Sequence, residues 1–164
     1  MPKQEFPFPM PNGWFCVTRV GDIQNGESKP FTFCEKEVVA FRTESGKVSV
    51  LDAYCGYSGI NLAISGTVEG ETINSPKHGI KWNIDGSCAE IGKDSGVPKE
   101  AMEVTTFSYP CQELNGFIWA WHHLLQEEPS FEIPAIDGFN GDDSKWGKEH
   151  HYEYHINTVL QEIA

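Results

Sequence analysis

Two short segments of the chain place a thiol or an imidazole close to another polar side chain. Cys55 lies two residues before Tyr57, and Ser75 lies three residues before His78. Thiolates and imidazoles are common metal ligands, and an imidazole can also stabilise a thiolate for nucleophilic or redox-sensing chemistry. Cys55 and His78 would give a single zinc or iron ion two ligands, fewer than the three or four that protein zinc sites use. A buried thiol and a hydrogen-bonded imidazole are the alternative interpretation.

Short runs of β-branched and aromatic residues, separated by turn residues, surround both segments. This pattern predicts antiparallel hairpins, with turns at residues 44–46 and 85–86 and a surface loop at 94–98. The tryptophans and phenylalanines of these runs are expected to form core rather than a ligand-binding box. The expected strands are residues 14–18, 31–33, 37–42, 47–52, 66–70, 72–74, 80–82, 103–107 and 116–121.

The chain divides into three parts by composition. Residues 1–12 are rich in proline and phenylalanine, which favours an extended arm because each proline fixes φ and lacks an N–H group. Residues 13–135 form the expected all-β domain. Residues 136–164 begin with a polar linker and continue into a short C-terminal tail, with a strand expected near 150–156 and a helix near 158–164.

Residues 52–57 and 75–79 resemble the two ligand loops of a Rieske iron-sulfur domain. The wider match is similar to the N-terminal domain of Rieske non-haem iron oxygenases, in particular the sterol and steroid oxygenase branch. The resemblance covers roughly residues 10–135 and implies a Rieske-type fold of antiparallel sheets with a small two-loop cluster-binding subdomain. The matching positions are residues 41–42, 46–48, 52–55, 59, 61–62, 66–68, 70, 78–79, 82, 85–88 and 115–123.

The resemblance assigns the four cluster-ligand positions to Cys55, Tyr57, Ser75 and His78. A Rieske centre uses two cysteines on one iron and two histidines on the other, so Cys55 and His78 alone retain ligand identity. Deprotonating a phenol or a hydroxyl at pH 7 costs more than deprotonating a thiol. We therefore expect no cofactor, with the Tyr57 ring filling the space of the cluster. A 2Fe-2S cluster held through Tyr57 or Ser75, and a single zinc or iron ion on Cys55 and His78, are the alternatives.

The resemblance also implies what the chain lacks. Its C-terminal tail is similar to the entry into the family's catalytic domain, and the segment that supplies the two-histidine, one-carboxylate iron site is absent. We expect that the chain alone does not activate oxygen.

Composition restricts the partners and the compartment. The formal net charge of −12 disfavours nucleic acid and anionic membrane surfaces, and no apolar run is long enough to span a bilayer. Five cysteines without a CxxC pair indicate reduced, mostly buried thiols and a cytoplasmic protein, with Cys88 a structural thiol. The histidines at 122, 123, 150, 151 and 155 are expected to be solvated, and no hydrolase, nucleotide-binding or zincin motif is present.

These observations favour a cluster-free domain of oxygenase descent that acts as a binding, structural or regulatory subunit. An intact oxygenase subunit, or self-association into the trimer typical of the family, would be its partner. The alternatives are an electron-transfer module with unusual cluster ligation and a piece of a longer oxidoreductase.

Overall fold

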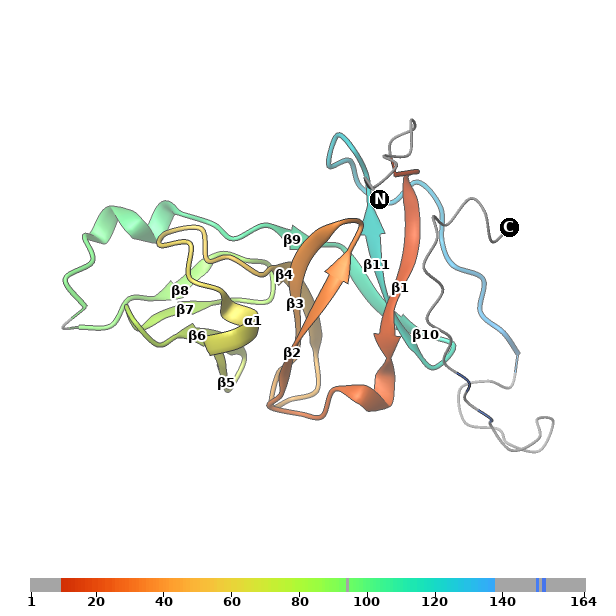
Figure 1. Ribbon diagram of the computed structural model, residues 1–164, viewed down its shortest axis with the longest axis horizontal. Coiled ribbons are helices and arrows are strands. Elements are labelled where there is room, and N and C mark those ends of the chain that lie inside the picture. Colours follow the sequence, from red (N-terminus) through yellow and green to blue (C-terminus); the bar gives the residue numbers. More distant parts are fainter. Residues whose placement is uncertain (1–9, 94, 138–149, 151, 153–164) are drawn as a thin grey trace, which may run out of the picture.

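The computed structural model describes residues 10–93, 95–137, 150 and 152. Within these residues the protein is almost entirely β, with three antiparallel sheets, one short α-helix and two short 3-10 helices (Figure 1). None of the helices in this part of the chain is long and apolar enough to cross a membrane. Apart from residues 150 and 152, the predicted tail strand and helix lie outside the described residues, as does most of the predicted N-terminal arm.

The first sheet is the middle layer of the molecule (Figure 1). Its strands, in order across the sheet, are β2 (Ser28–Phe33), β3 (Lys36–Arg42), β4 (Val48–Asp52) and β9 (Ser108–Tyr109). Residues 38–42 of β3 are all buried, because successive side chains of a strand point to opposite faces and both faces of this strand are covered. Val39 and Phe41 enter one hydrophobic core, whereas Val38 and Ala40 enter another.

The second sheet covers one face of this middle layer. Its strands are β1 (Gly13–Arg19), β11 (Phe117–His122) and β10 (Cys111–Leu114), in that order. Arg42 joins it to the middle layer, because the buried guanidinium forms an ion pair with Glu113 of β10. The same guanidinium donates hydrogen bonds to the carbonyl oxygens of Ile23 and Gly46, each at 2.9 Å.

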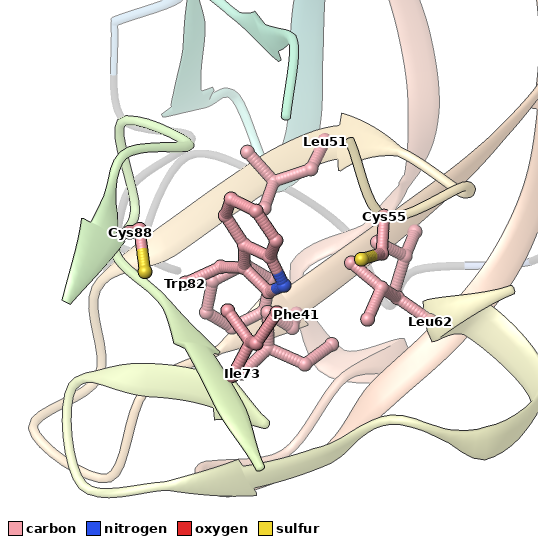
Figure 2. Close-up of a cluster of buried hydrophobic side chains, with 9 residues drawn as sticks. Phe41, Leu51, Cys55, Leu62, Ile73, Trp82 and Cys88 are labelled. Carbon is pink, nitrogen blue, oxygen red and sulfur yellow. The ribbon is translucent and has the colours of Figure 1, made fainter. Parts of the chain in front are cut away.

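The third sheet covers the opposite face and carries the second of the two sequence segments. Its strands are β5 (Thr67–Glu69), β6 (Thr72–Ser75), β7 (Ile80–Trp82) and β8 (Cys88–Glu90). Trp82 is fully buried in the core between this sheet and the middle layer, together with Phe41, Leu51 and Ile73 (Figure 2). Cys55 and Cys88 belong to the same core, and Trp82 lies between them in the view of Figure 2.

Three short helices complete the described fold. The α-helix α1 (Leu62–Ser65) follows the first loop, and the Asn61 side chain accepts hydrogen bonds from the backbone amides of Ala63 and Ile64 at its start. The 3-10 helices are η1 (Val20–Asp22) and η2 (Lys99–Glu103). The expected strand at 103–107 is wrong, because η2 occupies its start and Thr105 makes only an isolated bridge to Ser87.

Candidate functional site

The first loop connects β4 to α1 and is held by its own hydrogen bonds. The backbone amide of Cys55 donates to the carbonyl oxygen of Ile60 at 2.8 Å, and the Cys55 carbonyl oxygen accepts from the amide of Gly59 at 2.8 Å. The amide of Gly56 donates to the hydroxyl of Thr106 at 3.1 Å. A Cβ atom on Gly56 would lie 2.1 Å from the carbonyl oxygen of Thr105, so this close approach requires glycine.

The Cys55 side chain is buried and points into the core around Trp82 (Figure 2). Its sulfur lies 3.3 Å from the hydroxyl oxygen of Ser58 and 3.5 Å from the Ser58 amide nitrogen, which donates to it. Sequence reasoning did not assign a role to Ser58 or Thr106. The i+3 spacing from Cys55 was the available signal for Ser58, whereas Thr106 comes from a distant part of the chain.

The second loop is the turn between β6 and β7. The amide of Gly79 donates to the carbonyl oxygen of Ser75 at 2.9 Å and closes the turn. Gly79 has a φ of +59°, a conformation that residues with a Cβ rarely adopt. Its own carbonyl oxygen accepts from the amide of Gly92 at 3.0 Å, which ties the turn to the segment after β8. Lys77, in the middle of the turn, is exposed to solvent.

Tyr57 and His78 bring the two loops into contact. Their rings meet edge to face, with centroids 5.7 Å apart and an interplanar angle of 89°. His78 is half-buried and Tyr57 is 37% exposed, so the contact lies at the surface end of the loops. That Tyr57 fills the space of the cluster stays a prediction.

Ser75, the fourth site residue predicted from the sequence, has an unusual environment for a polar side chain. Its side chain is fully buried at the end of β6, and its hydroxyl oxygen has no hydrogen-bond partner. The indole nitrogen of Trp82, also fully buried, lacks a partner as well. A buried polar group without a partner loses the hydrogen bonds it would make to water, so Ser75 destabilises the fold relative to an apolar residue of similar size.

These residues do not fit the donor set of a Rieske cluster. Two of the four positions carry a phenol and a buried hydroxyl in place of an imidazole and a thiol. The side chain of Tyr57 lies against His78, and the Cys55 sulfur contacts Ser58. Among the described residues, no group of three or more histidines, cysteines, aspartates or glutamates is arranged to hold a metal ion.

The five cysteines are all free thiols in the structure. Two of them, Cys55 and Cys88, are buried, fewer than the sequence-based expectation of mostly buried thiols. Cys88 packs in the core around Trp82, and burial raises the pKa of its thiol. Its sulfur lies 3.6 Å from the sulfur of Met102 in η2, a contact that agrees with a packing role.

His122 and His123 differ from the sequence-based expectation. We predicted solvated histidines, but both side chains are half-buried at the end of β11. The Nδ1 atom of His123 accepts hydrogen bonds from the amides of Leu125 at 3.3 Å and Glu127 at 3.2 Å. The turn after β11 therefore covers His123, whereas His122 packs against the rings of Phe15 and Phe33. Neither contact was visible from their position at the end of an apolar strand. His150 is exposed, and 151 and 155 lie outside the described residues.

A family model for the Rieske [2Fe-2S] domain matches residues 13–107. The chain belongs to the Rieske domain family. The matched segment contains both loops, so the family assignment and the altered ligand positions concern the same part of the chain.

Curated relatives of this Rieske domain include oxygenase and desaturase proteins. Cholesterol 7-desaturase nvd 1 of Ciona intestinalis is 35% identical over 159 residues, which cover 97% of this chain and 33% of the relative. The oxygenase component of 3-ketosteroid-9-alpha-monooxygenase from Rhodococcus rhodochrous is 33% identical over 136 residues, covering 82% of this chain and 34% of the relative. The chain thus spans about a third of the length of these relatives.

Solved structures share the fold of this Rieske domain. The terminal oxygenase of carbazole 1,9a-dioxygenase from Nocardioides aromaticivorans IC177 superposes with a TM-score of 0.65 at 20% sequence identity. The superposition covers 75% of this chain and 34% of that oxygenase. The expected all-β Rieske fold of antiparallel sheets is confirmed.

Proposed function

We propose that this protein is a Rieske domain without a 2Fe-2S cluster, which acts as a binding, structural or regulatory subunit. The edge-to-face contact between Tyr57 and His78 carries the proposal. By resemblance, these two positions belong to the histidine pair that holds one iron of the cluster. With the phenol of Tyr57 at one of these positions, that iron would have a single imidazole ligand, from His78. The Tyr57 ring also occupies space beside His78.

The backbone of both loops supports the same proposal. Proteins that depend on a metal for folding lack sufficient contacts of their own at the metal site. Here the loop amides of Cys55, Gly56 and Gly79 all have backbone or side-chain acceptors. The core beneath them is formed by fully buried apolar side chains such as Leu62 and Trp82. The loops therefore have the contacts to keep their conformation without a cluster.

Elemental analysis of the protein, purified without oxygen, tests the cluster-free state. We expect iron, acid-labile sulfide and zinc at the level of a protein-free blank, and no visible absorption beyond that of the aromatic residues. A chelator should leave the midpoint of thermal unfolding unchanged. Iron and sulfide near two each per chain would overturn the proposal and make the protein an electron-transfer module with oxygen ligands.

We infer that the partner is an oxygenase subunit or further copies of this chain, as the trimers of the family imply. Exposed apolar residues support an interaction surface, since four of them lie within a single segment of 13 residues after β11. They are Leu124, Leu125, Phe131 and Ile136. The five free thiols agree with a reducing, cytoplasmic compartment for this assembly.

Light scattering after size-exclusion chromatography tests the association. A mass of three times the 18.4 kDa chain would support self-association, and a monomer that elutes with a co-expressed sterol-type oxygenase would support docking. Leu125→Glu should abolish either assembly because it places a charge in an apolar contact. Thr67→Glu, an exposed position on β5, is the matched control. A monomer that fails to bind the oxygenase would contradict the proposed association.

A further inference from the structure

A cavity of about 120 Å³ lies where the ends of β3, β9 and β11 meet. It is far from the two loops in sequence and is lined by no residue of either. Strands β9 and β11 contact each other, and both contribute residues to the wall of the cavity. Aromatic rings form one part of its wall and basic side chains another.

The aromatic wall is fixed by ring packing. Phe107 and Tyr109 meet edge to face with centroids 4.8 Å apart, and the hydroxyl of Tyr109 donates to a carboxylate oxygen of Asp52 at 2.7 Å. Trp121 stacks on His123 with an interplanar angle of 7°. Such a wall is preformed and apolar, as ligand sites commonly are.

The cavity wall holds more basic than acidic side chains, unlike the protein as a whole. The chain as a whole has twice as many acidic as basic residues, yet Lys36, His122 and His123 line this cavity against a single carboxylate, that of Glu127. The Nε2 atom of His123 lies 3.5 Å from the Glu127 carboxylate, so these two groups face each other. Among the described residues, the side chains of Lys36 and His122 have no hydrogen-bond or ion-pair partner.

We propose that this cavity binds a small monocarboxylate with an apolar body. The carboxylate lies against Lys36 and His122, and the apolar body lies against the rings of Phe107 and Tyr109. An apolar cavity of about 150 Å³ holds one benzene molecule in another protein. The present cavity is smaller, at about 120 Å³, but opens to solvent, so a short aliphatic chain or part of a single ring can enter it while the rest of the carboxylate lies at its mouth.

Protonation of His122 should be coupled to binding. Burial, followed by the charges of Lys36 and His123, lowers the pKa of His122. The rings of Phe15 and Phe33 meet the His122 ring edge to face, with centroids 6.3 and 6.4 Å away. The titratable groups that share the cavity wall with it are Lys36 from β3, Tyr109 from β9 with Asp52 behind it, and His123 and Glu127 from the turn after β11. An anion in the cavity opposes the two cationic neighbours and raises this pKa. By linkage, affinity for the anion increases as pH falls through the pKa of His122.

Titration of the full-length chain with benzoate tests the proposal. We expect saturable shifts of the His122 ring signals in NMR spectra, and binding about tenfold tighter at about pH 5.5 than at about pH 8, which corresponds to one pKa unit. Benzyl alcohol, an uncharged analogue, should bind at least about tenfold more weakly. Inorganic phosphate binding as tightly as benzoate would contradict the apolar part of the site, and no saturable benzoate binding would overturn the proposal.

Three variants separate the site from a general charge effect. Lys36→Gln should weaken benzoate binding about tenfold. Lys36 is exposed on β3, so the substitution removes no buried packing. Lys99→Gln makes the same change of net charge in η2 and should leave the affinity unchanged. Glu127→Gln should strengthen binding because it removes a like charge. Equal affinities in Lys36→Gln and the unaltered protein would overturn the proposal.

Discussion

The imidazole of His78 and the phenol of Tyr57 meet edge to face, with ring centroids 5.7 Å apart. In a Rieske centre, the residues at these two positions are imidazoles that share one iron. In this protein, a direct side-chain contact joins the same two loops. The Rieske fold is thus compatible with loops that are connected through protein contacts.

Restoring the two changed ligands should restore cluster binding. The double variant Tyr57→His with Ser75→Cys recreates the two-cysteine, two-histidine set, and we expect it to bind iron and sulfide near two each per chain. The measurement is elemental analysis with the visible spectrum after expression in iron-rich medium. Each single variant should bind neither element, since three ligands leave one iron incompletely held.

A matched double variant controls for loosened packing in that experiment. Tyr57→Phe with Ser75→Ala changes the same two positions and adds no metal ligand, so it should remain colourless. A folded but colourless Tyr57→His, Ser75→Cys protein would mean that the loops around the four positions have also diverged from the cluster-binding geometry.

Two buried serines should respond in opposite ways to replacement by alanine. The hydroxyl of Ser75 has no partner, so Ser75→Ala should raise the free energy of unfolding by about 1 kcal/mol. The hydroxyl of Ser49 donates to the carbonyl oxygen of Ile84 at 2.6 Å, so Ser49→Ala should lower it by about 1 kcal/mol. Urea denaturation measures both. A destabilising Ser75→Ala would show that this hydroxyl has a bound partner in solution.

The sequence predicted eight of the eleven strands that the structure describes, but not β8, β9 and β10. Runs of β-branched and aromatic residues located β3 and β4, and the glycine-bearing turn at residues 44–46 located their hairpin. The family resemblance supplied the loops. In contrast, β10 (Cys111–Leu114) follows a proline and has weak strand character, so no local pattern marked it. It forms because the edge of β11 offers it a partner.

The residues of the candidate site could be predicted from the sequence, but the contacts between them could not. The family resemblance identified Cys55, Tyr57, Ser75 and His78, whereas the Tyr57–His78 contact depends on the two loops approaching each other in space. Thr106, which binds the Gly56 amide, is 50 residues away in sequence. Such a long-range contact leaves no periodic signal.

Arg42 should be required for stable packing of the second sheet on the middle layer. Its guanidinium is buried, donates to three carbonyl oxygens and pairs with Glu113. Arg42→Lys retains the charge but cannot donate to all of these acceptors, and should lower the free energy of unfolding by about 3 kcal/mol. Lys47→Arg, at an exposed ion pair with Glu71, is the control and should change it by less than about 0.5 kcal/mol. Similar effects at both positions would contradict the buried network.

Stability should fall in mildly alkaline solution because of two thiols. Burial raises the pKa of Cys34 and of Cys111 from 9.0 to about 11. Between these values the unfolded chain has lost each thiol proton while the folded protein retains it, so the folded state binds more protons. The free energy of unfolding therefore decreases as pH rises from about 9 to about 11.

Cysteine variants measure that contribution directly. Urea denaturation at intervals between about pH 8 and about pH 10 should show that the free energy of unfolding decreases with pH. In Cys111→Ala this decrease should be smaller by about 1 kcal/mol. Tyr109 adds to the slope above this range, because burial and the hydrogen bond to Asp52 also raise its pKa. The comparison concerns the slope, so a loss of packing in the variant at all pH values does not affect it. An unchanged slope in the Cys34→Ala, Cys111→Ala double variant would show that these thiols titrate alike in the folded and unfolded states.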